Sequence, residues 1–292
     1  MILLISLLCV TVSGLTTGSK SVNIFWPALK HNRQPFKRFH CIAFVEPVAK
    51  IGENLYSSLN DAIIAAVPVS EETVTINVLQ DVTLDSGVAH EGEKSRDITF
   101  IGNGTQTVDV ITNTVSAEGG QLNYQRGSSF TFENLTIKAG EGDFDGIVCN
   151  ELTFKNCTIK GKLTLYGKAT FINCTFENTM ENQYSIWTWG GTEVKFEGCT
   201  FNTNGKAILL YGSASTNLVV NNCTFNDRNN GTAEKAAIEI GNDYNATYTL
   251  TVNNATVNGF APGKNTNSTL WANKNNMDAA HLTVTIDGTQ AH

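Results

Sequence analysis

A short phrase that recurs along the chain is the strongest constraint on its fold. It occurs as FENLTI (132–137), FKNCTI (154–159), FINCTF (171–176), FEGCTF (196–201), VNNCTF (220–225) and VNNATV (252–257). The intervals between successive copies are 17 to 32 residues. A period of this size, with insertions between copies, is typical of solenoids, because one such repeat cannot bury its apolar face alone and must stack on the next.

The asparagine of the phrase predicts a corner in each repeat. The residues two before and one after it are apolar and are expected to point inward, yet they are three apart, which a straight strand of period two does not allow. The chain must therefore bend at the asparagine, in the left-handed region that Asn and Gly tolerate best. Gly198 meets the same demand. The predicted ladder consists of Asn134, Asn156, Asn173, Asn222 and Asn254.

The residue after the corner is a cysteine in four copies, and these cysteines predict an inward column of small apolar side chains. They are Cys157, Cys174, Cys199 and Cys223. Inert core thiols are one interpretation, and disulfides between adjacent coils are another if the compartment is oxidising. A zinc site is not expected, because the thiols lie in a line and no CxxC occurs.

A second recurring phrase is a short strand that ends in glycine. It reads LTLYG (163–167), IWTWG (186–190), ILLYG (208–212) and IEIG (238–241). One repeat thus holds this strand, a bend, and a strand–Asn–strand unit, without any helical period. The sequence therefore predicts an all-β protein, a right-handed single-stranded parallel β-helix that occupies residues 46–292.

The first 66 residues do not contain the repeat. Residues 1–18 begin with MILLISLLCVTVSG and predict a signal peptide, and residues 19–45 predict a basic linker. Residues 54–66 predict a capping α-helix with Leu55, Leu59 and Ile63 on one face. No later segment is apolar over a length that spans a bilayer. The expected location is outside the cell or on its surface.

The asparagine ladder resembles the hallmark of the pectin-lyase-like superfamily of right-handed β-helices. The helix NLYSSLNDAIIAA followed by TVTINVLQDVTL (73–84) resembles the start of β-helix surface proteins of gut bacteria. In those proteins the helix plugs the N-terminal end of the solenoid. The resemblance implies the fold over residues 46–288 and says little about activity.

Catalysis is not favoured by the motifs. Pectate-lyase and polygalacturonase relatives imply clustered acids with basic partners, but the chain lacks His-Gly and Arg-x-Lys pairs. Asp143 and Asp145 of DFDGI could share a face, yet paired acid–base chemistry needs carboxylates on neighbouring coils. A polysaccharide lyase of the pectate or uronate type, or a glycoside hydrolase, remains an alternative. No catalytic residue, cofactor or metal ligand is predicted.

The glycine-ending strand predicts a binding surface. Alternation places Leu163, Ile186 and Ile208 inward, and it places aromatic residues outward next to the glycines. The candidate carbohydrate-binding residues are Tyr166, Trp187, Trp189 and Tyr211. Aromatic faces suit sugar rings, and exposed apolar strips usually have a use.

Two interpretations of the aromatic strip stay open. It is either an adhesion or glycan-binding surface, with a polysaccharide or host glycan as partner, or packing within a structural surface stalk. Residues 51–292 contain 14 Lys and Arg against 26 Asp and Glu, which argues against nucleic acid as a partner.

Overall fold

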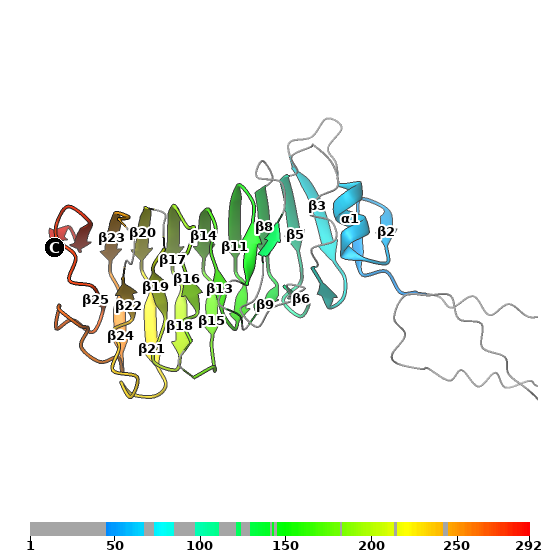
Figure 1. Cartoon of the computed structure of the whole chain (residues 1–292). Coiled ribbons are helices and arrows are strands. Elements are labelled where there is room, and N and C mark those ends of the chain that lie inside the picture. The colour runs from blue at the N-terminus through cyan, green and yellow to red at the C-terminus, as the bar shows by residue number, and fades with distance from the viewer. Residues whose placement is uncertain are drawn as a thin grey trace, which may run out of the picture. The chain divides into compact units, whose positions relative to one another are not determined.

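The computed structural model describes residues 45–66, 73–84, 97–110, 121–123, 129–140, 142, 145–181, 183–212, 215–241 and 245–292. The predicted signal peptide, residues 19–44 of the predicted linker, and Asp143 lie outside these residues. Val45–His292 forms one unit, in which short strands stack coil upon coil into a β-helix (Figure 1). The predicted fold class is confirmed.

The first sheet has 12 strands, and its central strands pair in parallel with matched register. They are, in spatial order, β2 (Asn54–Tyr56), β1 (Ala49–Ile51), β3 (Val74–Val78), β5 (Asp97–Ile101), β8 (Ser129–Glu133), β11 (Glu151–Lys155), β14 (Lys168–Ile172), β17 (Glu193–Glu197), β20 (Thr216–Asn221), β23 (Tyr248–Asn253), β26 (Leu282–Ile286) and β27 (Thr289–Gln290). From β3 to β23, each strand of this sheet is followed by a corner, beyond which the chain enters the second sheet.

The second and third sheets are built of shorter strands. The second contains β24 (Thr256–Asn258), β21 (Thr224–Asp227), β18 (Thr200–Thr203), β15 (Thr175–Glu177), β12 (Thr158–Lys160), β9 (Thr136–Lys138), β6 (Thr107–Asp109) and β4 (Val82–Thr83). The third contains β13 (Leu163–Thr164), β16 (Ile186–Trp187), β19 (Ile208–Leu210), β22 (Ile238–Ile240) and β25 (Trp271–Asn273), and the pair β7 (Gln121–Asn123) and β10 (Gly146–Val148) precedes it in the chain. One coil thus contributes one strand to each face.

The corner between the first and second sheets has the backbone that the asparagines predict. All five ladder asparagines have φ between 51° and 55°, and Gly198 has φ of 64°. The Asn254 amide donates to Asn222 Oδ1 over 2.9 Å, and the Asn222 amide donates to Glu197 Oε1 over 2.9 Å. The asparagines therefore both turn the chain and connect neighbouring coils.

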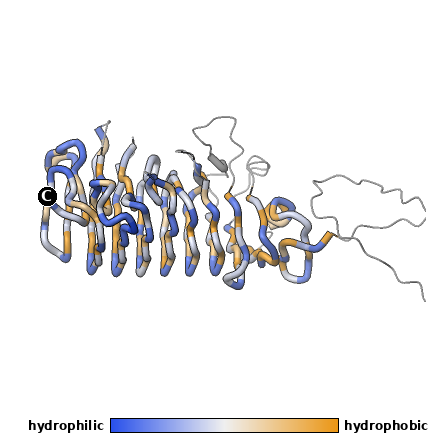
Figure 2. Tube along the Cα trace, turned by 90° about the horizontal axis from the view of Figure 1, so that it is seen from below, coloured by the Kyte–Doolittle hydropathy of each residue, from blue (hydrophilic) through white to orange (hydrophobic). Residues whose placement is uncertain are grey.

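The core is a set of side-chain columns that run along the axis. Phe132, Phe154, Phe171 and Phe196 are fully buried and stack with centroid separations of 4.9 to 5.2 Å. The alternation of apolar and polar residues along each coil is visible in Figure 2. Because each ring packs on the ring of the coil before it, the core grows by one layer per coil.

The N-terminal cap differs from the prediction in its boundaries. The α-helix α1 covers Leu59–Ala65, because Ser58 Oγ accepts the amide N–H of Asp61 as an N-cap. The residues before it form the β1–β2 hairpin, which pairs antiparallel with β3. Leu55 is accordingly exposed on a strand, whereas Leu59 and Ile63 are buried in the core. The predicted helix over 54–66 therefore started too early.

Short antiparallel strands form both edges of the first sheet. At the C-terminal end β27 pairs with β26, and at the N-terminal end β1 covers β3. Edge strands this short matter because a long bare edge of a sheet is a template for pairing with another chain.

Candidate functional site

The third sheet carries the predicted aromatic residues, and its strands are stacked in register. Leu163 aligns with Ile186, Ile186 with Ile208, and Ile208 with Ile238. These residues are buried in the core, as the alternation predicts. The residues that alternate with these along each strand point away from the core.

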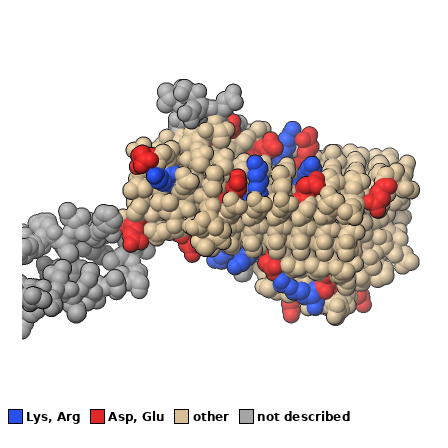
Figure 3. Space-filling view, turned by 180° about the vertical axis from the view of Figure 1, so that it is seen from behind, with Lys and Arg blue, Asp and Glu red and all other residues tan. Residues whose placement is uncertain are grey.

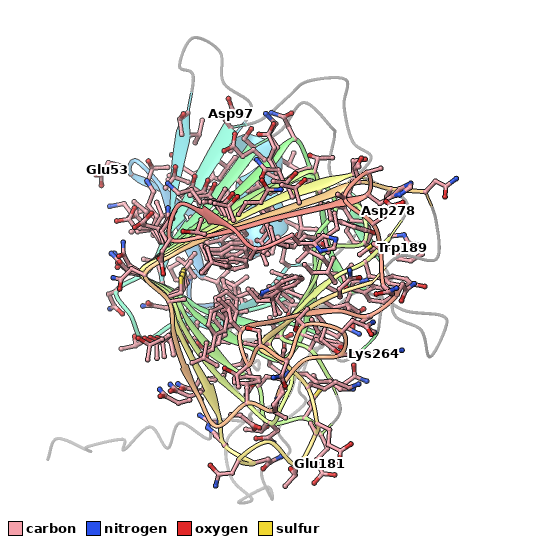
Figure 4. The ribbon with its side chains drawn as sticks, turned by 90° about the vertical axis from the view of Figure 1, so that its left-hand side faces the viewer. Glu53, Asp97, Glu181, Trp189, Lys264 and Asp278 are labelled. Atoms are coloured by element: carbon pink, nitrogen blue, oxygen red, sulfur yellow. The ribbon has the colours of Figure 1, made fainter. Side chains whose placement is uncertain are left out.

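Three of the four predicted aromatic residues form a contacting cluster on the outer side of this sheet. The rings of Trp187 and Trp189 lie 5.3 Å apart at 76°, and both rings lie 6.0 Å from that of Tyr211. Tyr166 occupies the position that aligns with Trp189 one coil earlier. All four residues are half-buried. Figure 4, viewed along the coil axis, shows Trp189 on the outside, on the same side as Asp278 and Lys264.

The glycines at the ends of these strands allow the close approach of neighbouring coils. Gly212 has φ of 141°, and a Cβ at this position would lie 2.2 Å from the carbonyl oxygen of Trp189. A larger residue would therefore push apart the two coils that hold Trp189 and Tyr211 together.

The outward column next to the aromatic residues is covered. Thr164 is fully buried, Leu209 is 8% exposed and Glu239 is 2% exposed, although their register places them on the outer face. The Tyr184 hydroxyl donates to Glu239 Oε2. Because Tyr184 precedes β16 and Glu239 lies in β22, the tyrosine spans the intervening coil of β19. An outer layer of side chains thus lies on part of the sheet.

Glu239 is a buried carboxylate with two partners. Besides Tyr184, the Lys235 ammonium lies 3.7 Å from its Oε1. Burial raises the pKa of the Tyr184 phenol, and the charge of Glu239 raises it further. Tyr184 is therefore a neutral hydrogen-bond donor at any physiological pH.

Lysines surround this layer. Lys162 is 2% exposed, donates to Gln183 Oε1 over 3.2 Å, and has its Nζ 4.9 Å from the ring centre of Trp187. Lys206 Nζ lies 5.2 Å from the ring centre of Tyr184. Both distances are within the range of cation–π contacts.

Three other lysines affect the pKa of Lys206. Burial lowers the pKa of the Lys206 ammonium, Glu239 opposes this, and Lys235, Lys274 and Lys162 lower the pKa again. The four lysines come from separate coils, and three of them act on Lys206.

Lys274 continues the aromatic column. The register aligns Tyr211 with Gly241, and Gly241 with Lys274. A Cβ on Gly241 would lie 3.3 Å from Lys274 Cδ and 3.5 Å from Tyr211 Cδ2. The absence of a side chain at Gly241 thus lets the Lys274 stem approach the tyrosine ring.

Comparison with known families agrees with this architecture. Residues 98–277, more than half of the chain, match the model described as "right handed beta helix region". The chain belongs to the right-handed β-helix family. No curated protein matches the chain, and no solved structure does. The family fixes the fold and leaves the activity of this right-handed β-helix to be inferred from its surfaces.

The cysteine column lies in the core of this β-helix. Cys157, Cys174, Cys199 and Cys223 are buried free thiols, as is Cys149. The neighbouring thiols Cys157 and Cys199, together with burial, raise the pKa of Cys174, and burial raises the pKa of Cys149 to about 12. Cys174 and Cys149 are therefore protonated and poor nucleophiles, which fits their interpretation as core residues.

Two features are absent from the part of the chain that the structure describes. There, His, Cys, Asp and Glu do not form a group of three that could hold a metal ion. Within the same residues, no helix has both the length and the apolarity to cross a membrane.

The sequence interpretation missed the polar half of the site, which is formed by Tyr184, Glu239 and the four lysines. A signal was present, because a lysine precedes the third-sheet strand in GKLTLYG, GKAILLYG and EKAAIEIG. The alternation of inward and outward side chains along the strand IEIG also predicts that Glu239 points outward. Tyr184 has no such signal, since it lies in an insertion outside the repeat.

Proposed function

We propose that this protein is a non-catalytic glycan-binding or adhesion protein that uses the outer face of its third sheet. The observation that carries the proposal is the contacting cluster of Trp187, Trp189 and Tyr211, which are half-buried and point away from the core. Aromatic rings that keep one side in water can hold the apolar faces of sugar rings. The stacked coils position the rings rigidly, which reduces the entropy cost of binding.

We also propose that the protein is secreted or displayed on the cell surface. This proposal rests on the apolar segment at residues 1–14, which is typical of a signal peptide. Outside the cell, the aromatic surface would meet polysaccharides. Seen from behind, the charged residues of the β-helix lie in separate clusters of both signs, with wide uncharged areas between them (Figure 3). That pattern does not form a basic stripe of the kind that holds nucleic acid.

A glycan-array screen of the full chain tests the proposal. The glycans that the unchanged protein binds should bind to Trp189→Ala about tenfold more weakly, which corresponds to a loss of about 1.4 kcal/mol in binding free energy. Tyr56→Ala is the matched control, because it removes a half-buried aromatic ring at the N-terminal cap. Equal binding by the unchanged protein and Trp189→Ala would contradict the proposal.

A polysaccharide lyase or hydrolase is the second candidate. It is favoured by the lowered pKa of Lys206 beside the buried carboxylate of Glu239, since perturbed groups cluster at catalytic sites. Release of products from uronic-acid polymers, lost in Lys206→Gln, would establish this alternative. A structural stalk is the expected role if neither binding nor turnover is found.

A further inference from the structure

We propose that the four cysteines of the column close into two disulfides, Cys157 with Cys174 and Cys199 with Cys223, which join neighbouring coils and stabilise the fold in an oxidising compartment. This inference rests on the proposed location outside the cell, where disulfides persist, and it does not depend on glycan binding.

The first observation is that the cysteines lie on four consecutive coils. Each is followed by a threonine that begins a strand of the second sheet, and these strands pair in register. In all three steps between the coils, the N–H of the later threonine donates to the carbonyl of the earlier cysteine over 2.9 Å. Neighbouring Cα atoms are therefore about 4.8 Å apart, within the range of about 4.4–6.8 Å that a disulfide spans.

The second observation is the direction of the thiols. The Sγ atoms of Cys157, Cys174 and Cys199 each donate over 3.4 Å to the carbonyl of the phenylalanine in the first-sheet strand one coil earlier. The side chains thus lean along the axis toward the preceding coil, which for Cys174 and Cys199 holds the neighbouring thiol. An S–H group is a weak donor, so little hydrogen bonding is lost when these free thiols pair.

The third observation is that a line of four thiols allows only one complete pairing. A bond between Cys174 and Cys199 would leave Cys157 and Cys223 three coils apart, or about 14 Å, which is too far for a disulfide. Leu135 and Ala255 take the same position in the coils before and after the line. The first thiol must therefore pair with the second, and the third with the fourth.

The chemistry is thiol–disulfide exchange with a small-molecule or protein disulfide as oxidant. One thiolate of a pair attacks this disulfide and releases one oxidant thiol, and the second thiolate then displaces the other. The pair loses two protons and two electrons, and the oxidant is reduced to two thiols. Cys157 and Cys199 are the attacking thiols, because the hydrogen bond with Cys174 lowers the pKa of both. The thiols are buried, so the exchange takes place before the coils close or during local opening.

The linked coils are those that carry the aromatic cluster. After each column cysteine the chain passes through the second sheet and enters the third-sheet strand of the same coil. The four strands reached in this way hold Tyr166, Trp189, Tyr211 and Glu239.

The test compares full chain made in a reducing cytosol with full chain secreted through an oxidising compartment. Both are unfolded without reductant in iodoacetamide, which blocks free thiols, and are then digested with trypsin. Cleavage after Lys160, Lys195 and Lys206 puts the four cysteines on separate peptides. Mass spectrometry of the secreted protein should show the two predicted links, and cytosolic protein equilibrated with oxidised glutathione should show the same links.

Two variants assign the links. Cys174→Ala should leave Cys157 alkylated and the link between Cys199 and Cys223 intact. Cys149→Ala is the control, because Cys149 lies between β10 and β11, at another corner of the coil, where its Sγ donates to the Glu151 carbonyl. The oxidised protein should melt at least about 6 °C above its reduced form, and Cys149→Ala should keep this difference.

Three results would overturn the inference. They are four alkylated column thiols in both the secreted and the glutathione-treated protein, a link between Cys174 and Cys199, and equal melting temperatures of the oxidised and reduced forms. Each of them leaves the proposed glycan binding intact, because the glycan array measures that function separately.

Discussion

The corner between the first and second sheets and the outer face of the third sheet contrast in how strictly they repeat. At the corner, five asparagines and one glycine share one backbone conformation, and the residues around them change little from coil to coil. On the third sheet, one outward column reads Thr164, Trp187, Leu209, Glu239 and Ala272.

The difference teaches which positions the fold constrains. A left-handed corner accepts few residue types, so the same requirement selects the same residue in every coil. An outward position on a strand accepts almost any residue, so the residues found there are selected by requirements other than the fold. Irregularity within a regular scaffold therefore indicates where a surface acts.

The largest expected effect is on the free energy of unfolding, and it compares a core column with the aromatic cluster. Phe171 stacks 4.9 Å from both Phe154 and Phe196, so Phe171→Ala should lower the free energy of unfolding by about 3–5 kcal/mol. Trp189→Ala should cost less than about 2 kcal/mol, because part of its ring already faces water. Urea denaturation of both variants measures the two values. A cost for Trp189 as large as that for Phe171 would make the aromatic cluster a structural element.

A smaller effect tests why the corner repeats. Asn222→Ala must place an ordinary side chain at φ of 55°, and it should lower the free energy of unfolding by about 1–3 kcal/mol. Asn222→Gly removes the same amide but accepts this φ, so its cost should be smaller. Equal losses in the two variants would mean that the amide hydrogen bonds, rather than the backbone, select asparagine.

The smallest effect concerns pH. The amides of Asn221 and Asn222 lower the pKa of Glu197 by donating to its carboxylate. A lowered pKa in the folded state adds stability above the ordinary carboxyl pKa, and this stability is lost as the pH falls from about 5 to 3. The Glu197 side chain is 34% exposed and water screens its charge, so the effect should be small.

Thermal unfolding across that pH range measures the effect, with Glu197→Gln as the comparison. The difference in melting temperature between the two proteins should shrink as the pH falls. A constant difference would show that the carboxylate charge has no part in the ladder.

The fold could be predicted because its rules are local. The spacing of Phe, Asn and Cys within one phrase requires a corner, and repetition of the phrase fixes the register of the coils. The cap was predicted less well, because Leu55 and Leu59 have helical spacing although Leu55 lies in strand β2 and only Leu59 lies in the helix. The N-cap Ser58, followed by Asp61 three residues later, was the better guide to the start of the helix.

The site could be predicted only in its aromatic half. Trp189 and Tyr211 each precede the glycine that ends the repeated strand, so their alignment follows from their positions in the repeat. Tyr184 and Glu239 are 55 residues apart and meet across an intervening coil. Which insertion folds over which coil depends on packing that no local spacing specifies.

The in-register stacking has a consequence for how such a protein can change over time. Each coil advances the chain by the same step, about 4.8 Å along the axis. Gain or loss of one whole coil between Trp189 and Lys274 would alter the gap between ring and cation by that step, while every remaining coil kept its own neighbours. Duplication of a short stretch of gene can thus lengthen or shorten this outer surface without any repacking of the interior.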